Sequence, residues 1–164
     1  MTDAAEVEAR LGRRARGAYE IVVRDAVGAP RVIRNHPLLD DGTPMPTRFW
    51  LVSKADRTAM GRLESEGGVR RAEAAVDPDE LAEAHRRYAA ERDDALPAGH
   101  DGPAPFGGVG GTRKGVKCLH AHWAWHLACG DDPVGRWIEA QLAAEVSDGA
   151  GLAAPTTPSG TLGG

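Results

Sequence analysis

Gly107–Leu142 reads GGVGGTRKGVKCLHAHWAWHLACGDDPVGRWIEAQL, and its pattern predicts a pair of helices. Large apolar side chains recur every four residues in the middle of this stretch, at Leu119, Trp123 and Leu127. Residues at this spacing lie on one face of a helix. We therefore predict a helix over about Val116–Cys129 whose apolar stripe packs into the core.

Capping residues mark the end of this helix and the start of the next one. Gly130 is typical of the position just after a helix, because glycine adopts the left-handed conformation at little cost. Asp132 followed by Pro133 is typical of a helix start, since aspartate caps free N–H groups and proline fits the first turn. The second helix is amphipathic, with three- and four-residue spacing between Val134, Trp137, Ile138, Gln141 and Leu142. The two helices together predict a C-terminal αα-hairpin.

Three short strands are predicted in the N-terminal half. Tyr19–Val23 and Arg31–Ile33 are rich in β-branched residues, and Gly28 and Pro30 indicate a turn between them. We therefore expect a β-hairpin. A proline-rich loop follows it and leads to a third strand over Thr47–Val52.

Two more helices are predicted after the third strand. Ser53 has the pattern of an N-cap, and the helix that it begins ends at about Glu66, before a pair of glycines. Asp77 precedes a proline and an acidic first turn, which is the pattern of another helix start. That helix continues to about Asp93.

These elements describe one α+β domain, in which a small three-strand sheet packs with about four helices. The chain has 164 residues, of which 41% are hydrophobic and 27% are charged, as in ordinary globular domains. We assign the domain to residues 1–146, with residues 1–16 as a short helix or a mobile arm. Residues 147–164 are rich in small and polar residues, which predicts a disordered tail.

Composition argues against several classes of protein. The net charge is −4 and the isoelectric point is near 5.9, whereas a nucleic-acid-binding domain is usually basic. No apolar run approaches the roughly 20 residues that span a bilayer, and the acidic N-terminus lacks the pattern of a secretory signal. Two cysteines cannot form a disulfide framework. We expect a cytoplasmic protein.

An anion-binding or regulatory module is the leading functional hypothesis. No Asp or Glu occurs between Asp101 and Asp131, so the cations of this segment have no acidic partner nearby in the sequence. A glycine-rich basic loop runs into a helix N-terminus, where free N–H groups and the helix dipole favour a phosphate-like anion. The expected partner is a small anionic ligand. The predicted binding residues are Gly110, Gly111, Arg113, Lys114, Gly115 and Lys117.

A metal site, with zinc as the candidate cofactor and hydrolysis as its candidate activity, is the first alternative. Cysteine and histidine are the ligands that zinc prefers, and this segment holds Cys118, His120, His122 and His126. One zinc cannot bind all four, because eight residues of helix span about 12 Å. The cysteine and the first histidine converge only if the helix begins after the cysteine. A complete metal site needs ligands from elsewhere, and the candidates are His36, Asp40, Asp41 and His85. Arg48 is a further supporting residue, together with the two aspartates.

Two further interpretations stay open. Cys118 lies near a helix start and beside Lys117, and both features lower a thiol pKa, with His122 one turn away as a base. Alternatively, the protein is a non-catalytic interaction domain that binds another protein, and its histidines and tryptophans are structural. An exposed Trp125 beside a wide apolar patch would favour this alternative.

Seven blocks of this chain carry a family resemblance. They are Leu11–Arg13, Arg16-Gly17, Leu39–Pro44, Pro46–Leu51, Arg62–Gly68, Gly115–His120 and Asp132–Gly135. On these residues the chain resembles a bacterial, mainly actinobacterial, family catalogued as domain of unknown function number 501. The block Lys117-Cys118-Leu119-His120 is the most specific part.

The resemblance implies a small cytoplasmic protein without an assigned activity. Members of that family are often encoded near a septum-formation initiator and an exopolyphosphatase-type phosphatase. Many members carry further cysteines in the hairpin and after the third strand, where this chain has Asp25-Ala26-Val27 and Val52-Ser53-Lys54. The departure leaves Cys118 and His120 as the pair shared with the family and weakens the metal hypothesis.

Overall fold

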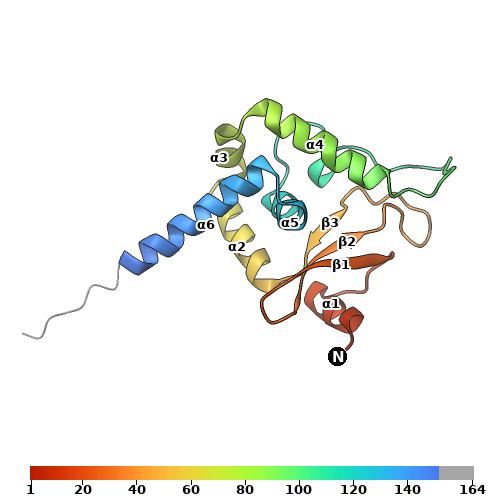
Figure 1. The fold of residues 1–164 in the computed structure, drawn as a ribbon, viewed down its shortest axis with the longest axis horizontal. Coiled ribbons are helices and arrows are strands. Elements are labelled where there is room, and N and C mark those ends of the chain that lie inside the picture. The colour runs from red at the N-terminus through yellow and green to blue at the C-terminus, as the bar shows by residue number, and fades with distance from the viewer. Residues whose placement is uncertain (152–164) are drawn as a thin grey trace, which may run out of the picture.

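The computed structural model describes residues 1–151 of the chain (Figure 1). Its strands are β1 (Tyr19–Arg24), β2 (Pro30–Asn35) and β3 (Phe49–Leu51). Its helices are α1 (Asp3–Leu11), α2 (Lys54–Ser65), α3 (Gly68–Ala75), α4 (Pro78–Asp93), α5 (Leu119–Cys129) and α6 (Pro133–Gly151), with one 3₁₀ turn, η1 (Val109–Gly111). The α+β class, the three strands and the C-terminal helix pair predicted from the sequence are confirmed.

The sheet is antiparallel, in the order β1-β2-β3. Asp25 holds the turn of the predicted hairpin, because its Oδ1 accepts hydrogen bonds from the amides of Val27 and Ala29 at 3.0 and 2.9 Å. On the other side of β2, Ile33 lies opposite Trp50 of β3. This pairing fixes which side chains of the sheet face which helix.

The two faces of the sheet pack against different helices. Val7 of α1 forms a small apolar cluster with Ile33 and Val52, and all three side chains are fully buried. Val32 and Phe49 face the other way, into the main core. Alternate residues of a strand point to opposite faces, so β2 contributes to both clusters. For residues 1–16 the sequence left two interpretations, a short helix or a mobile arm, and the structure contains a helix there, α1.

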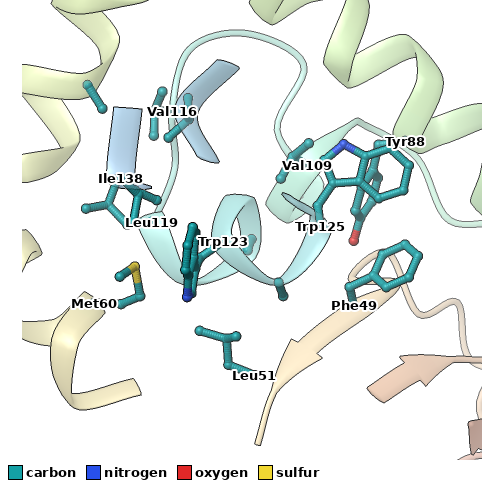
Figure 2. Close-up of a cluster of buried hydrophobic side chains, with 14 of the residues drawn as sticks. Phe49, Leu51, Met60, Tyr88, Val109, Val116, Leu119, Trp123, Trp125 and Ile138 are labelled. Atoms are coloured by element: carbon teal, nitrogen blue, oxygen red, sulfur yellow. The ribbon is translucent and has the colours of Figure 1, made fainter. Parts of the chain in front are cut away.

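Helix α5 lies at the centre of the main core, with β3, α2 and α6 packed against it (Figures 1 and 2). Leu119 and Trp123 of the predicted stripe are 0% and 4% exposed, and Leu127 is partly buried. Trp125 is also buried, with its ring centroid 5.2 Å from that of Phe49. A helix that is buried on nearly every side is the element around which a domain packs.

The capping residues predicted from the sequence act as caps. Ser53 Oγ accepts a hydrogen bond from the Asp56 amide at 3.2 Å. Asp77 Oδ1 accepts one from the Glu80 amide at 3.0 Å. Gly130 takes the left-handed conformation at the end of α5, with a φ of +77°. Local chemistry therefore sets these helix ends.

Helix α3 was not predicted from the sequence. The predicted stop after α2 is correct, because Gly67 turns the chain with a φ of +78°. The chain then enters a new helix at Gly68, where an added Cβ would meet the backbone of Leu63. Ala72 is the buried residue that anchors this short helix in the core. A helix with so little apolar surface forms through its packing against α2 and α6.

Two helix boundaries also differ from those predicted. Helix α5 begins at Leu119 and not at Val116, and Cys118 precedes it in an extended conformation without a side-chain cap. Helix α6 continues through Ser147 to Gly151, inside the segment predicted to be a disordered tail. The rest of that predicted tail, residues 152–164, lies outside the described residues. Within residues 1–151, no helix combines the length and the apolar character needed to cross a membrane.

Candidate functional site

Two carboxylates occupy the N–H groups on which the predicted anion site depends. The Leu119 amide, at the start of α5, donates to Glu64 Oε1 at 2.7 Å, and the Val116 amide donates to Glu73 Oε2 at 2.8 Å. Glu64 comes from α2 and Glu73 from α3. At the N-terminus of α5, where we predicted an external anion, a carboxylate of the same chain accepts the Leu119 amide.

The glycines of the predicted loop serve packing. Gly110 is buried with a φ of +70°, and an added Cβ would lie beside Lys117 and Ala121. Gly115 has a φ of +66°, and its carbonyl accepts a hydrogen bond from His85 Nε2 at 2.9 Å. Gly111 also has a positive φ, of +80°. These residues let the loop turn sharply against α4 and α5.

The predicted cations do not converge on the start of α5. Arg113 and Lys114 line a hollow of about 440 Å³ together with Glu73 and His85. The Arg113 guanidinium also lies over the Phe106 ring, 5.3 Å from its centroid. Lys117 is exposed and does not line this hollow. The carboxylate at the wall of the hollow opposes the binding of an anion there.

A second surface, which we name the basic groove, lies on the other side of α5. It consists of two neighbouring hollows of about 850 and 310 Å³, which share Arg57 and His120 in their linings. Helices α1 and α2 supply one part of the wall, and β3 and the start of α5 supply the other. Among the residues that line it, we define the groove by Glu6, Arg10, Arg13, Trp50, Lys54, Arg57, Cys118 and His120.

Three cations of the basic groove have no acidic partner among residues 1–151: Arg13, Lys54 and Arg57. The Arg13 guanidinium lies over the Trp50 ring, 4.8 Å from its centroid. Arg57 Nη1 donates to the Arg10 carbonyl oxygen at 2.7 Å, which holds its side chain in place. Arg10 itself pairs with Glu6 at 2.7 Å. The groove therefore carries a net positive charge on side chains that the fold positions.

His120 is held at the base of the basic groove by a carboxylate. Its Nδ1 lies 3.0 Å from Glu64 Oε1, the atom that also accepts the Leu119 amide. The side chains of His120 and Glu64 are 36% and 26% exposed. Because an ionised carboxylate only accepts hydrogen bonds, Nδ1 carries the proton. Nε2, which has no hydrogen-bond partner among residues 1–151, is then the basic nitrogen of the ring.

Cys118 also lines the groove, but its thiol is not activated. It is a free, half-buried cysteine. Burial raises the pKa of the Cys118 thiol, and Glu64 adds to that effect, while Lys117 and nearby amides lower it less. The direction is opposite to the one predicted from the sequence. The base proposed for it, His122, is fully buried and bonded elsewhere.

The candidate metal ligands are dispersed. His122 Nδ1 donates to the buried Asp132 carboxylate at 2.9 Å, and His126 Nε2 lies 3.3 Å from Glu139. His120 is bonded to Glu64. Within residues 1–151 no three His, Cys, Asp or Glu side chains are placed to hold a metal ion. Helix α5 begins after Cys118, which is the condition under which Cys118 and His120 could converge. No third ligand among the described residues completes a metal site with them.

The residues proposed as support have structural roles. Hydrogen bonds from the Thr43 side chain and from the Thr43 amide, which lies 3.0 Å from Asp41 Oδ1, lower the pKa of the Asp41 carboxyl. Asp40 lies in the same turn and is exposed. Arg48 is buried and bridges β3 to α4 through Glu91 at 2.8 Å. None of the three lines the basic groove.

Most of the basic groove is not predicted by the sequence patterns. Arg13, Lys54, Arg57 and Glu64 lie 54 or more residues before Cys118 in the chain. Two signals were present, because Arg13 lies in the block Leu11–Arg13 and Glu64 lies in the block Arg62–Gly68, and both blocks carry the family resemblance. Placing these blocks beside Gly115–His120 would have required the fold.

Comparisons with known proteins bear on the family and not on the activity. No curated protein and no solved structure matches the chain. A family match covers residues 21–140, which includes most of β1, all of β2 and β3, the start of α5 and the groove residues from Trp50 to His120. The chain belongs to the family described as Protein of unknown function (DUF501).

Proposed function

We propose that this protein is a binding module for a small phosphate-like anion, and that the anion lies in the basic groove. The observation that carries this proposal is the convergence of Arg13, Lys54 and Arg57 on one groove without an acidic partner among residues 1–151. Guanidinium groups donate paired hydrogen bonds whose geometry fits phosphate oxygens. His120 adds a polar group at the base of the same groove.

The groove suits an anion better than the glycine-rich loop does. The hollow in the loop is lined by two cations, Arg113 and Lys114, and one carboxylate, Glu73. The basic groove is lined by four cations, of which only Arg10 pairs with the one lining carboxylate, Glu6, among residues 1–151. The groove therefore has the larger excess of positive charge for an anionic ligand.

The interaction-domain alternative lacks the feature that would favour it. Trp125 is 3% exposed and lies in the core, where its ring packs against the rings of Phe49 and Tyr88. It forms no exposed patch for a partner protein. For the location of the protein, the free thiols of Cys118 and Cys129 suit a reducing compartment, and we place it in the cytoplasm.

Calorimetric titration with inorganic phosphate and pyrophosphate tests the proposal. The variant Arg13→Ala/Arg57→Ala removes two charges from the groove, and Arg113→Ala/Lys114→Ala removes two charges from the loop as a matched control. We expect the groove variant to lose at least about tenfold in affinity, since each lost charge-assisted hydrogen bond is worth about 1.5–3 kcal/mol. The control should bind as the parent does. Equal binding by the groove variant and the parent would overturn the proposal, and a loss confined to the control would place the site in the loop.

A further inference from the structure

His120 has a different environment from the other histidines of the described chain. His85 is bonded through both ring nitrogens, to the Val109 amide and the Gly115 carbonyl. His122 and His126 are buried. His120 alone among them combines a carboxylate on Nδ1 with a position in a groove that carries unpaired cations. That combination orients one ring nitrogen and leaves the other available to a ligand.

We infer that Nε2 of His120 accepts a phosphoryl group from a small phosphoryl donor, such as an acyl phosphate or a phosphoramidate, bound in the basic groove. This inference rests on the proposed function, because the donor is the anion that the groove binds. It adds a covalent step at a named atom. The hydrogen bond of Nδ1 to Glu64 directs the lone pair of the ring to Nε2.

The step balances as a transfer between donor and ring. The Nε2 lone pair forms the new N–P bond, and the bond from phosphorus to the leaving group of the donor breaks. The leaving group keeps that electron pair: an acyl phosphate releases a carboxylate, and a phosphoramidate releases ammonia, which takes a proton from solvent. The ring gains positive charge in this step. The Glu64 carboxylate, which accepts the hydrogen bond of the Nδ1 proton, stabilises that charge. No oxidant, reductant or metal is needed.

The cations of the groove suit the transferred group. Charge on the three outer oxygens of a phosphoryl group is stabilised in transfer mainly by positioned positive charges. Lys54 and Arg57 share the larger hollow with His120, and Arg13 shares the smaller one. Arg57 is held by its hydrogen bond to the Arg10 carbonyl, so its guanidinium needs little reorganisation.

Cys118 is the competing nucleophile in the same groove, and it is the weaker candidate. The thiolate is the nucleophilic form of cysteine. Burial raises the pKa of Cys118, which keeps the thiol protonated. A histidine with the correct tautomer needs no deprotonation before it attacks.

His36 serves as an internal control for the reactivity of His120. It is half-buried and lines a hollow that also contains Arg13 and Arg16. Its Nδ1 lies 3.2 Å from the Leu38 carbonyl oxygen, so no carboxylate supports its ring. If proximity to arginine alone produced phosphorylation, His36 and His120 would react alike.

The experiment is phosphorylation of the full chain by potassium phosphoramidate, followed by peptide mass spectrometry and phosphorus NMR. We expect one acid-labile phosphoryl group per chain on His120, formed at least several-fold faster than any on His36. His120→Gln should abolish it, Glu64→Gln should slow it several-fold, and His36→Gln, outside the basic groove, should leave it unchanged. Circular dichroism of each variant confirms that the fold is kept.

The outcomes separate this inference from the proposed function. The inference would be overturned if the parent protein gained no acid-labile phosphate, or if His36 and His120 were phosphorylated equally. Calorimetric binding of phosphate would then still support the basic groove as an anion site. A parent protein that neither binds phosphate nor becomes phosphorylated would overturn both.

Discussion

Glu64 Oε1 lies 3.0 Å from Nδ1 of His120, although 56 residues separate them in the chain. The same oxygen accepts the Leu119 amide at 2.7 Å. One carboxylate from α2 therefore marks where α5 begins and orients the histidine at the base of the basic groove. Helix start and candidate site are set by a single tertiary contact.

Replacing Glu64 should cost stability as well as site geometry. We expect Glu64→Ala to lower the free energy of unfolding by about 1–2 kcal/mol, because a half-buried charge-assisted contact to two donors is lost. Urea denaturation followed by circular dichroism measures the change. Glu66→Ala, at an exposed position of the same segment, is the control and should change stability by less than about 0.5 kcal/mol. Equal effects of the two variants would contradict the role given to Glu64.

The buried pair of His122 and Asp132 ties α5 to α6. Asp132 is fully buried, accepts the His122 Nδ1 hydrogen bond at 2.9 Å and also caps the Gly135 amide at 2.8 Å. We expect Asp132→Ala to lower the free energy of unfolding by about 3–5 kcal/mol, as for other buried pairs that lose one partner. The adjacent Asp131, which makes only exposed ion pairs, is the control. Its replacement by alanine should cost less than about 1 kcal/mol.

His85 should make stability depend on pH. Burial lowers the pKa of His85 from its ordinary value of 6.5, and the neighbouring His122 adds to that effect. The folded state thus favours the neutral ring, which accepts the Val109 amide through Nδ1. The unfolded chain binds more protons below about pH 6.5, so this contribution is complete above that pH and is lost as the pH falls.

Urea titrations at several pH values from about 7.5 downward measure this effect. We expect the free energy of unfolding to decrease below about pH 6.5 and the decrease to be smaller in His85→Gln. His100→Gln, whose ring is on the surface and bonded to the Pro103 carbonyl, should keep the parent's dependence. A His85→Gln variant with the parent's full pH dependence would assign the effect to another group.

Two glycine-to-alanine replacements should have opposite signs. Gly61 lies in α2 with nothing within 4 Å of an added Cβ, so Gly61→Ala should raise the free energy of unfolding by about 0.5–1 kcal/mol. Gly108 packs against His85, and an added Cβ would fall 2.5 Å from its ring. Gly108→Ala should therefore lower the free energy of unfolding by about 1–3 kcal/mol. Thermal denaturation of the two variants beside the parent shows both signs in one experiment.

Local patterns were sufficient for the elements that depend on local chemistry. The strands, the caps at Ser53 and Asp77, and the end of α5 at Gly130 all follow from residues within a few positions of each other. Such features arise from backbone preferences and from side chains that bond to nearby amides. They appear in the structure where they were predicted.

The sequence alone determined the α+β class, the central apolar helix and the family to which the chain belongs. Only the tertiary structure decided where α5 begins, that α3 is helical and where the unpaired cations gather. Each of these depends on distant groups: Glu64 and Glu73 at the start of α5, Ala72 in the core, and Arg13 and Arg57 across from His120. Charges act through space at short range, so a segment that lacks acids in the sequence can still meet them once the chain has folded.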